Sequence, residues 1–561
     1  MPRLSYQHPA IPVELLTETI KFLGEDYANI VPKGSQTPRT TIQDLNSCAL
    51  ACKLFSSLCR PYIFRRIVLG RPIEYTHMDE DDVLDSSAYS NQLLSLLSVL
   101  RQNRGLAGLV QELHICVSDF INTKTGRPFF NAGQLKGCKS ILQSFPNLGT
   151  LEIYYPSSQW RRGGRKSSWT NLLTSLVRHY VANGSLKRLN LDSKWHPRNS
   201  SSRVISYKKL LSCSSLRFLE LHNDILDYID SETLPVVSSI TDLKFSNMIF
   251  TFSLLKHFPN LESLSLHEVT STLFTADDPD EVELAPCIRS LVLNQSKMQT
   301  LRCIYAVQSK KLGVPPFATV QSFTLIVKDP SKYCLKELRS ILLDMPNLKS
   351  FNLAFMLNRL QYFEGVDPIA VCAETTQRIA ETLRTCTTFS LSFTRIASLR
   401  IYKELLSSFS SLLHALRNHN EIQEIVLNLS TLDKDWKSET CIEEGRYNET
   451  KTMVSFVPDL YVPLTNASAL LSCPEAFPEL KQVKVNVDFL IDWFLICDRD
   501  MDIIEPLRVT LQDTLKGSPL VDILGNRFIT RDDVRGSLSL DVNGEVGPWL
   551  LDGYMWRKTP L

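Results

Sequence analysis

The chain has 561 residues, of which 43% are hydrophobic and 22% are charged, and these proportions are typical of a folded, water-soluble protein. Its 61 Lys and Arg nearly balance its 60 Asp and Glu, so there is no chain-wide field that would attract nucleic acid or an anionic membrane. No stretch approaches the roughly 18 uninterrupted apolar residues of a transmembrane helix, and the N-terminus has no apolar run of signal-peptide type. We therefore expect neither a membrane nor a nucleic-acid partner.

The 14 Cys form no Cys-x-x-Cys pair, and no His is clustered near them at the spacing of a zinc site. Cys48 and Cys52 are four residues apart on an expected helix, which favours core packing over metal binding. Neither a metal nor a cofactor is therefore expected. Reduced thiols fit the cytoplasm or the nucleus, and we expect the protein in one or both.

Residues 1–70 are expected to form a small helical unit. Pro12 stands at a helix start, where its missing N–H is not needed. Apolar residues follow at Leu15, Leu16 and Ile20, which is the spacing of one helix face. After a polar loop, a second apolar helix face completes the unit.

Residues 71–105 are expected to connect this unit to the rest of the chain. They contain an acidic run at 79–85 and a leucine-rich helix at 93–100. The acidic run lacks the glycine and the twelve-residue spacing of a calcium-binding loop. A solvated loop is the expectation for it.

A short cassette recurs from residue 110 to residue 487: an apolar residue, two free positions, an apolar residue, one free position and an apolar residue. The last two apolar positions alternate with polar ones, which is the period of a strand buried on one face. The copies begin at Val110, Leu148, Leu186, Leu216, Ile240, Leu261, Ile288, Val320, Leu348, Ile396, Ile422 and Leu480.

Three copies follow a proline. Residues 145–148 and 258–261 read Phe-Pro-Asn-Leu, and residues 345–348 read Met-Pro-Asn-Leu. Proline ends the helical run before it, because it lacks the N–H and its ring clashes with the preceding turn. Helix-and-strand units of this kind cannot bury their apolar faces alone but share a core when stacked, so the cassette predicts a solenoid.

The cassette resembles the leucine-rich repeat. The resemblance implies an α/β fold over residues 106–489, with a parallel sheet on the concave side and helices outside. The copies begin 21 to 58 residues apart, so we expect uneven repeats without a continuous asparagine ladder. Residues 490–561 are expected to form a C-terminal cap, in which Asn543 and Gly544 signal a hairpin turn.

The polar positions between the inward-facing residues are the candidates for binding a target protein. They alternate with the buried positions and so share the concave face. Their mixture of charges, amides and aromatics suits protein recognition, although a solvated surface explains many of them. The candidates are Tyr154, Glu220, His222, Lys244, His267, Arg400, Tyr402 and Lys484.

One basic loop, residues 160–169, carries four Lys and Arg between two Trp. A plain exposed loop is the expectation, with nuclear import or partner contact as the alternative. Nucleic-acid binding by a single loop in a neutral chain is not expected.

Nothing in the sequence predicts catalysis. Phosphate-binding glycine loops, nucleophile elbows and metalloprotease motifs are absent. His267 and Glu268 are adjacent strand positions, whose side chains point to opposite faces. An enzyme on this scaffold would need a nucleophile near His222 or His267, and we expect no enzyme.

The first seventy residues resemble the F-box. Residues 11–16 read Ile-Pro-Val-Glu-Leu-Leu, where the F-box opens with Leu-Pro-x-Glu-Leu-Leu. Residues 50–55 read Leu-Ala-Cys-Lys-Leu-Phe, where the F-box has an aliphatic-Val-Cys-Lys/Arg-x-Trp run. Residues 62–67 look like the segment by which F-boxes of large fungal families join their repeats.

This second resemblance implies a substrate-recognition subunit of a cullin–RING ubiquitin ligase, with the helices on a Skp-type adaptor and the repeats on an unknown target. Two alternatives stay open. The chain could be a leucine-rich-repeat scaffold outside any ligase, with its helices serving only as a cap, or an enzyme. The expected adaptor contacts are Pro12, Leu15, Leu16, Ile20, Leu50 and Phe55.

Overall fold

The protein is described from a computed structural model, in which the chain divides into two compact units, Met1–Leu221 and His222–Leu561. Each unit is described by itself. The structure describes residues 13–29, 39–69, 86–116, 132–154, 168–192, 210–222, 236–246, 249–250, 255, 257–267, 269–271, 288–294, 317–327, 338–356, 379–396, 399–417, 420–432, 466–467, 469–471, 473–492 and 535–545.

The first unit begins with three helices, α1 (Val13–Asn29), α2 (Arg39–Ala51) and α3 (Lys53–Ile63). They pack mainly against one another, around the buried side chains of Ile20, Leu45 and Cys59. The predicted small helical unit is confirmed as a set of helices with an interior of its own. Pro12 lies outside the described residues.

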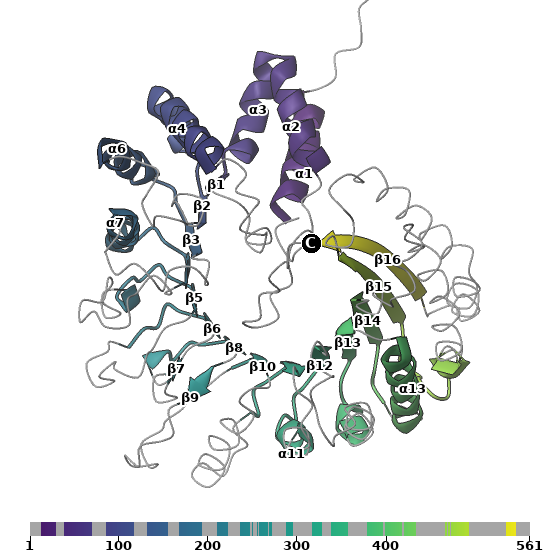
Figure 1. Cartoon of the computed structure of the whole chain (residues 1–561). Helices are drawn as coiled ribbons and strands as arrows, with labels where there is room; N and C mark the ends of the chain where they lie inside the picture. Colours follow the sequence, from purple (N-terminus) through teal and green to yellow (C-terminus); the bar gives the residue numbers. More distant parts are fainter. Residues whose placement is uncertain are drawn as a thin grey trace, which may run out of the picture. The chain divides into compact units, whose positions relative to one another are not determined.

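A parallel sheet follows in the first unit, in the strand order β1, β2, β3, β4, β5. β1 pairs with β2, β2 with β3 and β3 with β4, each in parallel. Helices α4, α6 and α7 lie along one side of these strands (Figure 1). The elements are β1 (Arg66–Leu69), α4 (Ser86–Gln102), α5 (Arg104–Ala107), β2 (Glu112–Cys116), α6 (Ala132–Leu142), β3 (Thr150–Tyr154), α7 (Ser168–Asn183), β4 (Arg188–Asp192) and β5 (Phe218–His222).

The second unit also contains a parallel sheet, in the order β6, β8, β10, β11, β12, β13, β14, β15, β16, and two short strands, β7 (Ile249–Phe250) and β9 (Thr270–Ser271), pair separately. The elements are β6 (Asp242–Ser246), β8 (Ser263–His267), β10 (Ser290–Asn294), β11 (Ser322–Val327), α11 (Leu338–Leu343), β12 (Ser350–Met356), η10 (Ala380–Leu383), β13 (Thr388–Ile396), α13 (Leu399–Leu416), β14 (Glu424–Leu432), β15 (Gln482–Asp492) and β16 (Arg535–Glu545).

The strands align so that cassette residues of the same type form columns. Leu113, Leu151 and Leu189 are register partners in the first unit. In the second unit, Phe323, Phe351 and Phe389 form such a column, with ring centroids 5.6 and 6.2 Å apart. Alignment matters because the side-chain period of a strand is two, so a slip by one residue would turn every apolar side chain out of the core.

Successive strands begin at a common hydrogen-bond pattern, in which one carbonyl of the preceding repeat accepts from two consecutive N–H groups. In the first unit, the Gln111 carbonyl oxygen accepts bonds from two consecutive N–H groups, of Gly149 at 2.9 Å and Thr150 at 3.0 Å. In the second unit, the Gln321 carbonyl accepts in the same way from Lys349 and Ser350. Each repeat is thereby held to the one before it.

The residue just before the first cassette position adds a side-chain link between repeats. Asn147 donates to the Gly108 carbonyl at 2.6 Å and Asn347 to the Ala318 carbonyl at 2.7 Å. This explains the Asn of the Pro-Asn-Leu segments. Ser215 and Thr319 donate from the same position to the carbonyls of Leu186 and Ile288, so a link between repeats at this position does not require asparagine.

Two expectations are wrong. The cassette at Ile396 does not form a strand across Leu399 and Ile401, because β13 ends at Ile396 and α13 begins at Leu399. Its apolar residues also fit a helical period, and Leu406, Phe409, Leu413 and Leu416 complete that buried helix face. The other cassette copies each form a strand, as predicted.

The expected hairpin at Asn543 and Gly544 is the second error. Both residues lie within β16, paired in parallel with Leu490 and Ile491 of β15. An Asn-Gly pair supports a tight turn only where the chain reverses, and here the pairing partner fixes an extended backbone instead.

We predict that Phe351→Ala lowers the free energy of unfolding by about 3–5 kcal/mol, the usual loss for a buried aromatic. Phe351 is 0% exposed and stacks on Phe323 and Phe389. Urea unfolding followed by circular dichroism measures the change. Leu343→Ala is the control, because Leu343 is 63% exposed, and an equal loss in both variants would contradict the aligned column.

Candidate functional site

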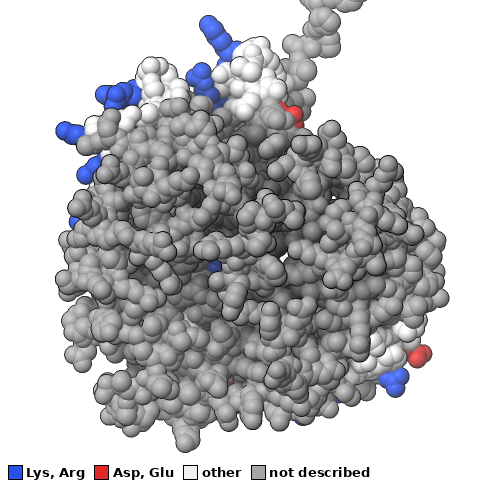
Figure 2. Space-filling model, in the orientation of Figure 1, with Lys and Arg blue, Asp and Glu red and all other residues white. Residues whose placement is uncertain are grey.

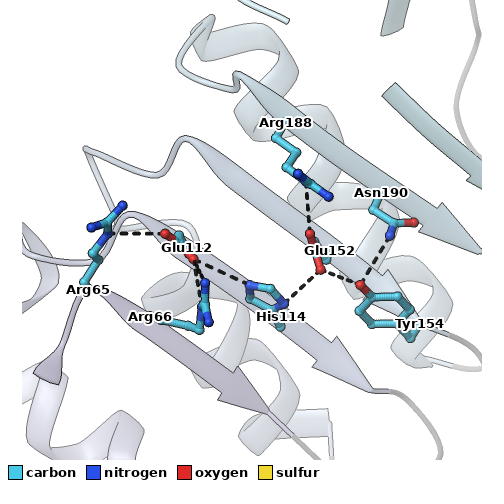
Figure 3. Close-up of polar contacts among 8 residues, drawn as sticks. All are labelled: Arg65, Arg66, Glu112, His114, Glu152, Tyr154, Arg188 and Asn190. Atoms are coloured by element: carbon cyan, nitrogen blue, oxygen red, sulfur yellow. Dashed lines mark hydrogen bonds and ion pairs between the residues drawn. The ribbon is translucent and has the colours of Figure 1, made fainter. Parts of the chain in front are cut away.

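The first unit carries a continuous polar network on the face of its sheet opposite to the inward-facing leucines (Figure 3). On β1 to β4 these side chains alternate with the buried residues, so the strand period brings them to one face. Arg65 lies immediately before β1 and reaches the same carboxylate as Arg66. We call this set the polar network. Its members are Arg65, Arg66, Glu112, His114, Glu152, Tyr154, Arg188 and Asn190.

Glu112 anchors one end of the polar network. Arg66 Nε donates to Glu112 Oε2 at 2.7 Å, and Arg65 Nε lies 3.2 Å from the other carboxylate oxygen, Oε1. Arg66 precedes β2 in the sequence by more than forty residues, but it is the register partner of Glu112 across β1 and β2. The two arginines neutralise a half-buried carboxylate.

Glu152 anchors the other end. His114 Nδ1 lies 2.9 Å from Glu152 Oε2, and Arg188 Nε lies 3.2 Å from Oε1. The Tyr154 hydroxyl donates to the same carboxylate, and Asn190 Nδ2 donates to the Tyr154 hydroxyl oxygen at 3.2 Å. His114 therefore lies between two carboxylates, since its Nε2 is 3.9 Å from Glu112 Oε2.

These contacts shift the ionisation of the carboxylates. Burial would raise the pKa of Glu112, but His114, Arg66 and Arg65 outweigh it and lower that pKa to about 2. Burial likewise opposes the change at Glu152, whose pKa His114, Tyr154 and Arg188 lower to about 2.

The pKa of the His114 imidazole shifts in the opposite direction. Burial lowers the pKa of His114, but its contacts with Glu112 and Glu152 prevail and raise it above 6.5. Burial and the charge of Glu152 raise the pKa of Tyr154, which keeps its hydroxyl a donor. The arrangement favours a charged imidazolium between two carboxylates.

The predicted target-binding residues fall into three groups. Tyr154 belongs to the polar network, and Glu220 shares its face but is only 4% exposed. His222, Lys244, His267 and Lys484 are half-buried strand residues, and Lys484 is paired with Glu424 at 2.5 Å.

The predicted strand positions of Arg400 and Tyr402 are wrong. They lie on α13 and not on a strand, so they do not share the face of the other candidates. Glu112, Arg65 and Arg66, which do belong to the polar network, were missed because they lie outside the cassette positions that we used to choose candidates.

A hydroxyl–imidazole pair occurs in the second unit. Ser265 Oγ lies 2.9 Å from His267 Nε2 on β8. A serine nucleophile also needs a group, usually a carboxylate, that orients the imidazole. The register neighbours are Lys244 and Ser246 on β6 and Val292 on β10, and none of these supplies a carboxylate.

The predicted adaptor contacts divide between surface and interior. Leu15 is 60% and Leu50 is 87% exposed, and Leu16 is half-buried. Ile20, which we expected at the contact, is 2% exposed and forms the interior of the helical unit, with Phe55 packed against it. Ile20 is therefore a core residue, because it faces α2 and α3.

Two exposed apolar residues of the helices were missed. Phe22 is 66% and Leu54 is 41% exposed. Phe22 lies seven residues after Leu15, two helical turns on, so the two side chains share one face of α1. That spacing could have identified it from the sequence.

Two other kinds of site are absent from the described part of the chain. No group of three or more His, Cys, Asp or Glu among them is placed to hold a metal ion. None of the described helices combines the length and apolar character needed to cross a membrane.

Comparisons with known proteins name no family for this chain. No protein-family model matches the chain, and no curated protein does. Among solved structures, it is similar to the leucine-rich repeat-containing protein LegL7 from Legionella pneumophila, with 14% identity over 73% of this chain and 88% of that one and a TM-score of 0.27.

A second solved structure, the APL1 leucine-rich repeat domain, is 10% identical over 58% of this chain and 69% of that one, with a TM-score of 0.16. At such TM-scores neither similarity supports a further inference. The leucine-rich-repeat character of the fold rests on the cassette columns and the parallel strand order of each unit.

We predict that acid removes the stabilising effect of the polar network. The contribution of Glu112 and Glu152 to the free energy of unfolding is fully present above the ordinary Glu pKa of 4.5 and is lost as the pH falls toward 2. That of His114 is fully present below 6.5 and is lost as the pH rises through its raised folded-state pKa.

Urea unfolding at a series of pH values measures this effect. At pH 6, Glu152→Gln should lower the free energy of unfolding by roughly 3 kcal/mol, because it leaves the largely buried His114 imidazolium without its nearest carboxylate. The difference from wild type should shrink in acid. Glu475→Gln, at an exposed position, is the control. A difference that stays constant down to pH 2 would contradict the network.

Proposed function

We propose that this chain is a protein-recognition scaffold whose N-terminal helices dock on a Skp-type adaptor while its repeats bind a target for a cullin–RING ubiquitin ligase. The exposure of large apolar side chains on α1 to α3 is the observation that carries this proposal. Such side chains at a surface mark a site that another protein covers.

The helical unit offers that surface without giving up its own core. Ile20, Leu45 and Cys59 are buried inside it, while Leu15 and Phe22 project from α1 and Leu50 projects from the end of α2. Of the eight exposed large apolar residues in the described part of the chain, four belong to these three helices: Leu15, Phe22, Leu50 and Leu54. A unit serving only to close a stack would instead turn its apolar residues toward the repeats.

The likeness of residues 11–16 and 50–55 to the F-box supports the identity of the partner. Leu15 and Leu50 stand in the two motif segments and are both exposed, as adaptor contacts must be. The proposed role requires no chemistry, because holding a target beside a ubiquitin-loaded enzyme raises its effective concentration.

We further propose that the chain is not itself an enzyme. Holding a target beside another enzyme requires no bond-making or bond-breaking step by this chain. The second candidate function is a scaffold outside any ligase, which the adaptor experiment distinguishes.

We predict that the full chain captures a purified Skp-type adaptor and that Leu15→Asp with Leu50→Asp reduces capture at least roughly tenfold, because two apolar contacts become desolvated charges. Both positions are exposed, so the fold should tolerate the change. A pull-down quantified by immunoblot measures it.

The matched control is Val236→Asp with Leu343→Asp, two exposed apolar residues of the second unit at 71% and 63%. This variant should capture the adaptor as wild type does. Failure of the wild-type chain to bind would remove the ligase role, and equal loss in both variants would remove the assigned surface.

A further inference from the structure

The near-neutral total conceals a strong separation of charge along the chain. Residues 86–221 contain 19 Lys and Arg against 5 Asp and Glu, a net charge of +14. Residues 222–561 contain 33 Lys and Arg against 44 Asp and Glu, a net charge of −11. The repeats of the first unit are thus strongly basic, although the whole chain carries only +1.

The acidic side chains of this segment that the structure describes lie away from the surface of the helices. Those whose surroundings the structure describes are Glu112, Glu152 and Glu220, and all three lie buried or half-buried on the sheet face that carries the polar network. Glu112 and Glu152 are paired there with His114 and arginines. The acids are therefore engaged on one face of the sheet, away from the helices.

Exposed cations gather on the helices of the first unit. Arg101 is in the last turn of α4, and Lys136 and Lys139 lie one turn apart on α6; all three are exposed, as is Arg104 at the start of α5. Helices α4 and α6 contact each other. We call these four residues the basic surface, and Figure 2 shows Lys and Arg side chains projecting from this part of the molecule.

One of these cations, Arg101 of α4, lies directly against α6. Arg101 Nη2 lies 3.5 Å from the place that a Cβ on Gly137 would occupy, and Gly137 lies between Lys136 and Lys139 in the sequence. The absence of a side chain at Gly137 lets the guanidinium lie against α6. Cations on two helices that contact each other repel one another, and a bound anion would reduce that repulsion.

Helix dipoles explain only part of the arrangement. A cation in the last turn is favoured by the negative end of the helix, which accounts for Arg101 and Lys139. It does not account for Lys136, which lies before the last turn of α6. A partner with repeated negative charge accounts for all four.

We propose that the basic surface binds an acidic polypeptide segment, in which Asp or Glu recurs along the chain. This inference rests on the proposed function only in taking the partner to be a protein, and adaptor docking is not required for it. Alternate carboxylates along such a segment could pair with cations on two adjacent helices. Arg101 and Arg104 could each hold a carboxylate with two parallel hydrogen bonds.

Nucleic acid fits the surface less well. Beyond residues 86–221 the chain is net negative, so a long polyanion meets repulsion outside the basic surface and no long-range attraction toward the whole molecule. Single strands also bind by stacking bases on exposed aromatic rings. Within residues 86–221, every aromatic residue whose burial the structure describes is buried or half-buried.

The test measures binding of the full-length chain to a short fluorescein-labelled peptide in which Glu alternates with Gly, by fluorescence anisotropy. We expect saturable binding that weakens as salt rises, and much weaker binding of the matched Gln/Gly peptide. Lys136→Glu with Lys139→Glu should weaken binding roughly tenfold, since each exposed ion pair changes an equilibrium constant by up to about fivefold and reversal adds repulsion.

The control variant, Lys349→Glu with Lys481→Glu, makes the same charge change at exposed positions of the second unit and should bind like wild type. No saturable binding by wild type, equal weakening in both variants, or tighter binding of single-stranded oligothymidine of the same length would each overturn the proposal.

The same variants separate this proposal from adaptor docking. Lys136→Glu with Lys139→Glu should leave adaptor capture unchanged, and Leu15→Asp with Leu50→Asp should leave peptide binding unchanged. Loss of peptide binding in the leucine variant would show that the basic surface is not the site.

Discussion

The parallel hydrogen-bond ladder between successive repeats is the constraint on which the rest of the structure depends. Its register brings Leu151 against Leu113 and Phe351 against Phe323, so the apolar columns and the polar rows are fixed together. The polar network follows from the same register: Arg66 meets Glu112 and His114 meets Glu152 because their strands are aligned residue for residue. The function of this scaffold therefore depends on which side chains occupy the polar strand positions that alternate with the apolar columns.

The polar network has an energetic cost that the register alone does not remove. Burying Glu152 at 7% exposure is unfavourable unless the carboxylate is paired and hydrogen-bonded. His114, Arg188 and Tyr154 supply those contacts from three neighbouring strands. The network thus links β2, β3 and β4 on the face opposite to the leucines. It requires particular residues at aligned positions, whereas apolar packing accepts different side chains of similar size.

Much of the fold could be predicted from the sequence, because burial on one face imposes a strict period. The copies at Leu148 and Leu261 carry the full pattern with its proline and form strands as expected. The copy at Ile396 failed because three apolar residues at short spacing fit a strand and a helix alike, and the surrounding apolar positions of α13 decided between them. The hairpin predicted at Asn543 and Gly544 was wrong because an Asn-Gly pair forms a turn only where the chain reverses direction.

The candidate sites were harder to predict. Alternation placed Tyr154 and Glu220 on the correct face, but partnership across strands, such as that of Arg66 with Glu112, depends on the register between distant segments. Whether Ile20 or Leu15 faces outward depends on how α2 and α3 pack, which the helical period of α1 does not contain. The basic surface was missed because a total charge near zero says nothing about how charge is distributed along the chain.

The doubled hydrogen bonds at the strand starts make each stack directional. The earlier repeat always supplies the carbonyl, as Gln111 and Gln321 do, and the later repeat always supplies the two N–H groups. At each of these points, separating two repeats would leave one carbonyl of the earlier repeat and two N–H groups of the later repeat without their partners. The freed groups would have to find water instead, so the two faces produced by such a separation present different hydrogen-bonding groups to the solvent.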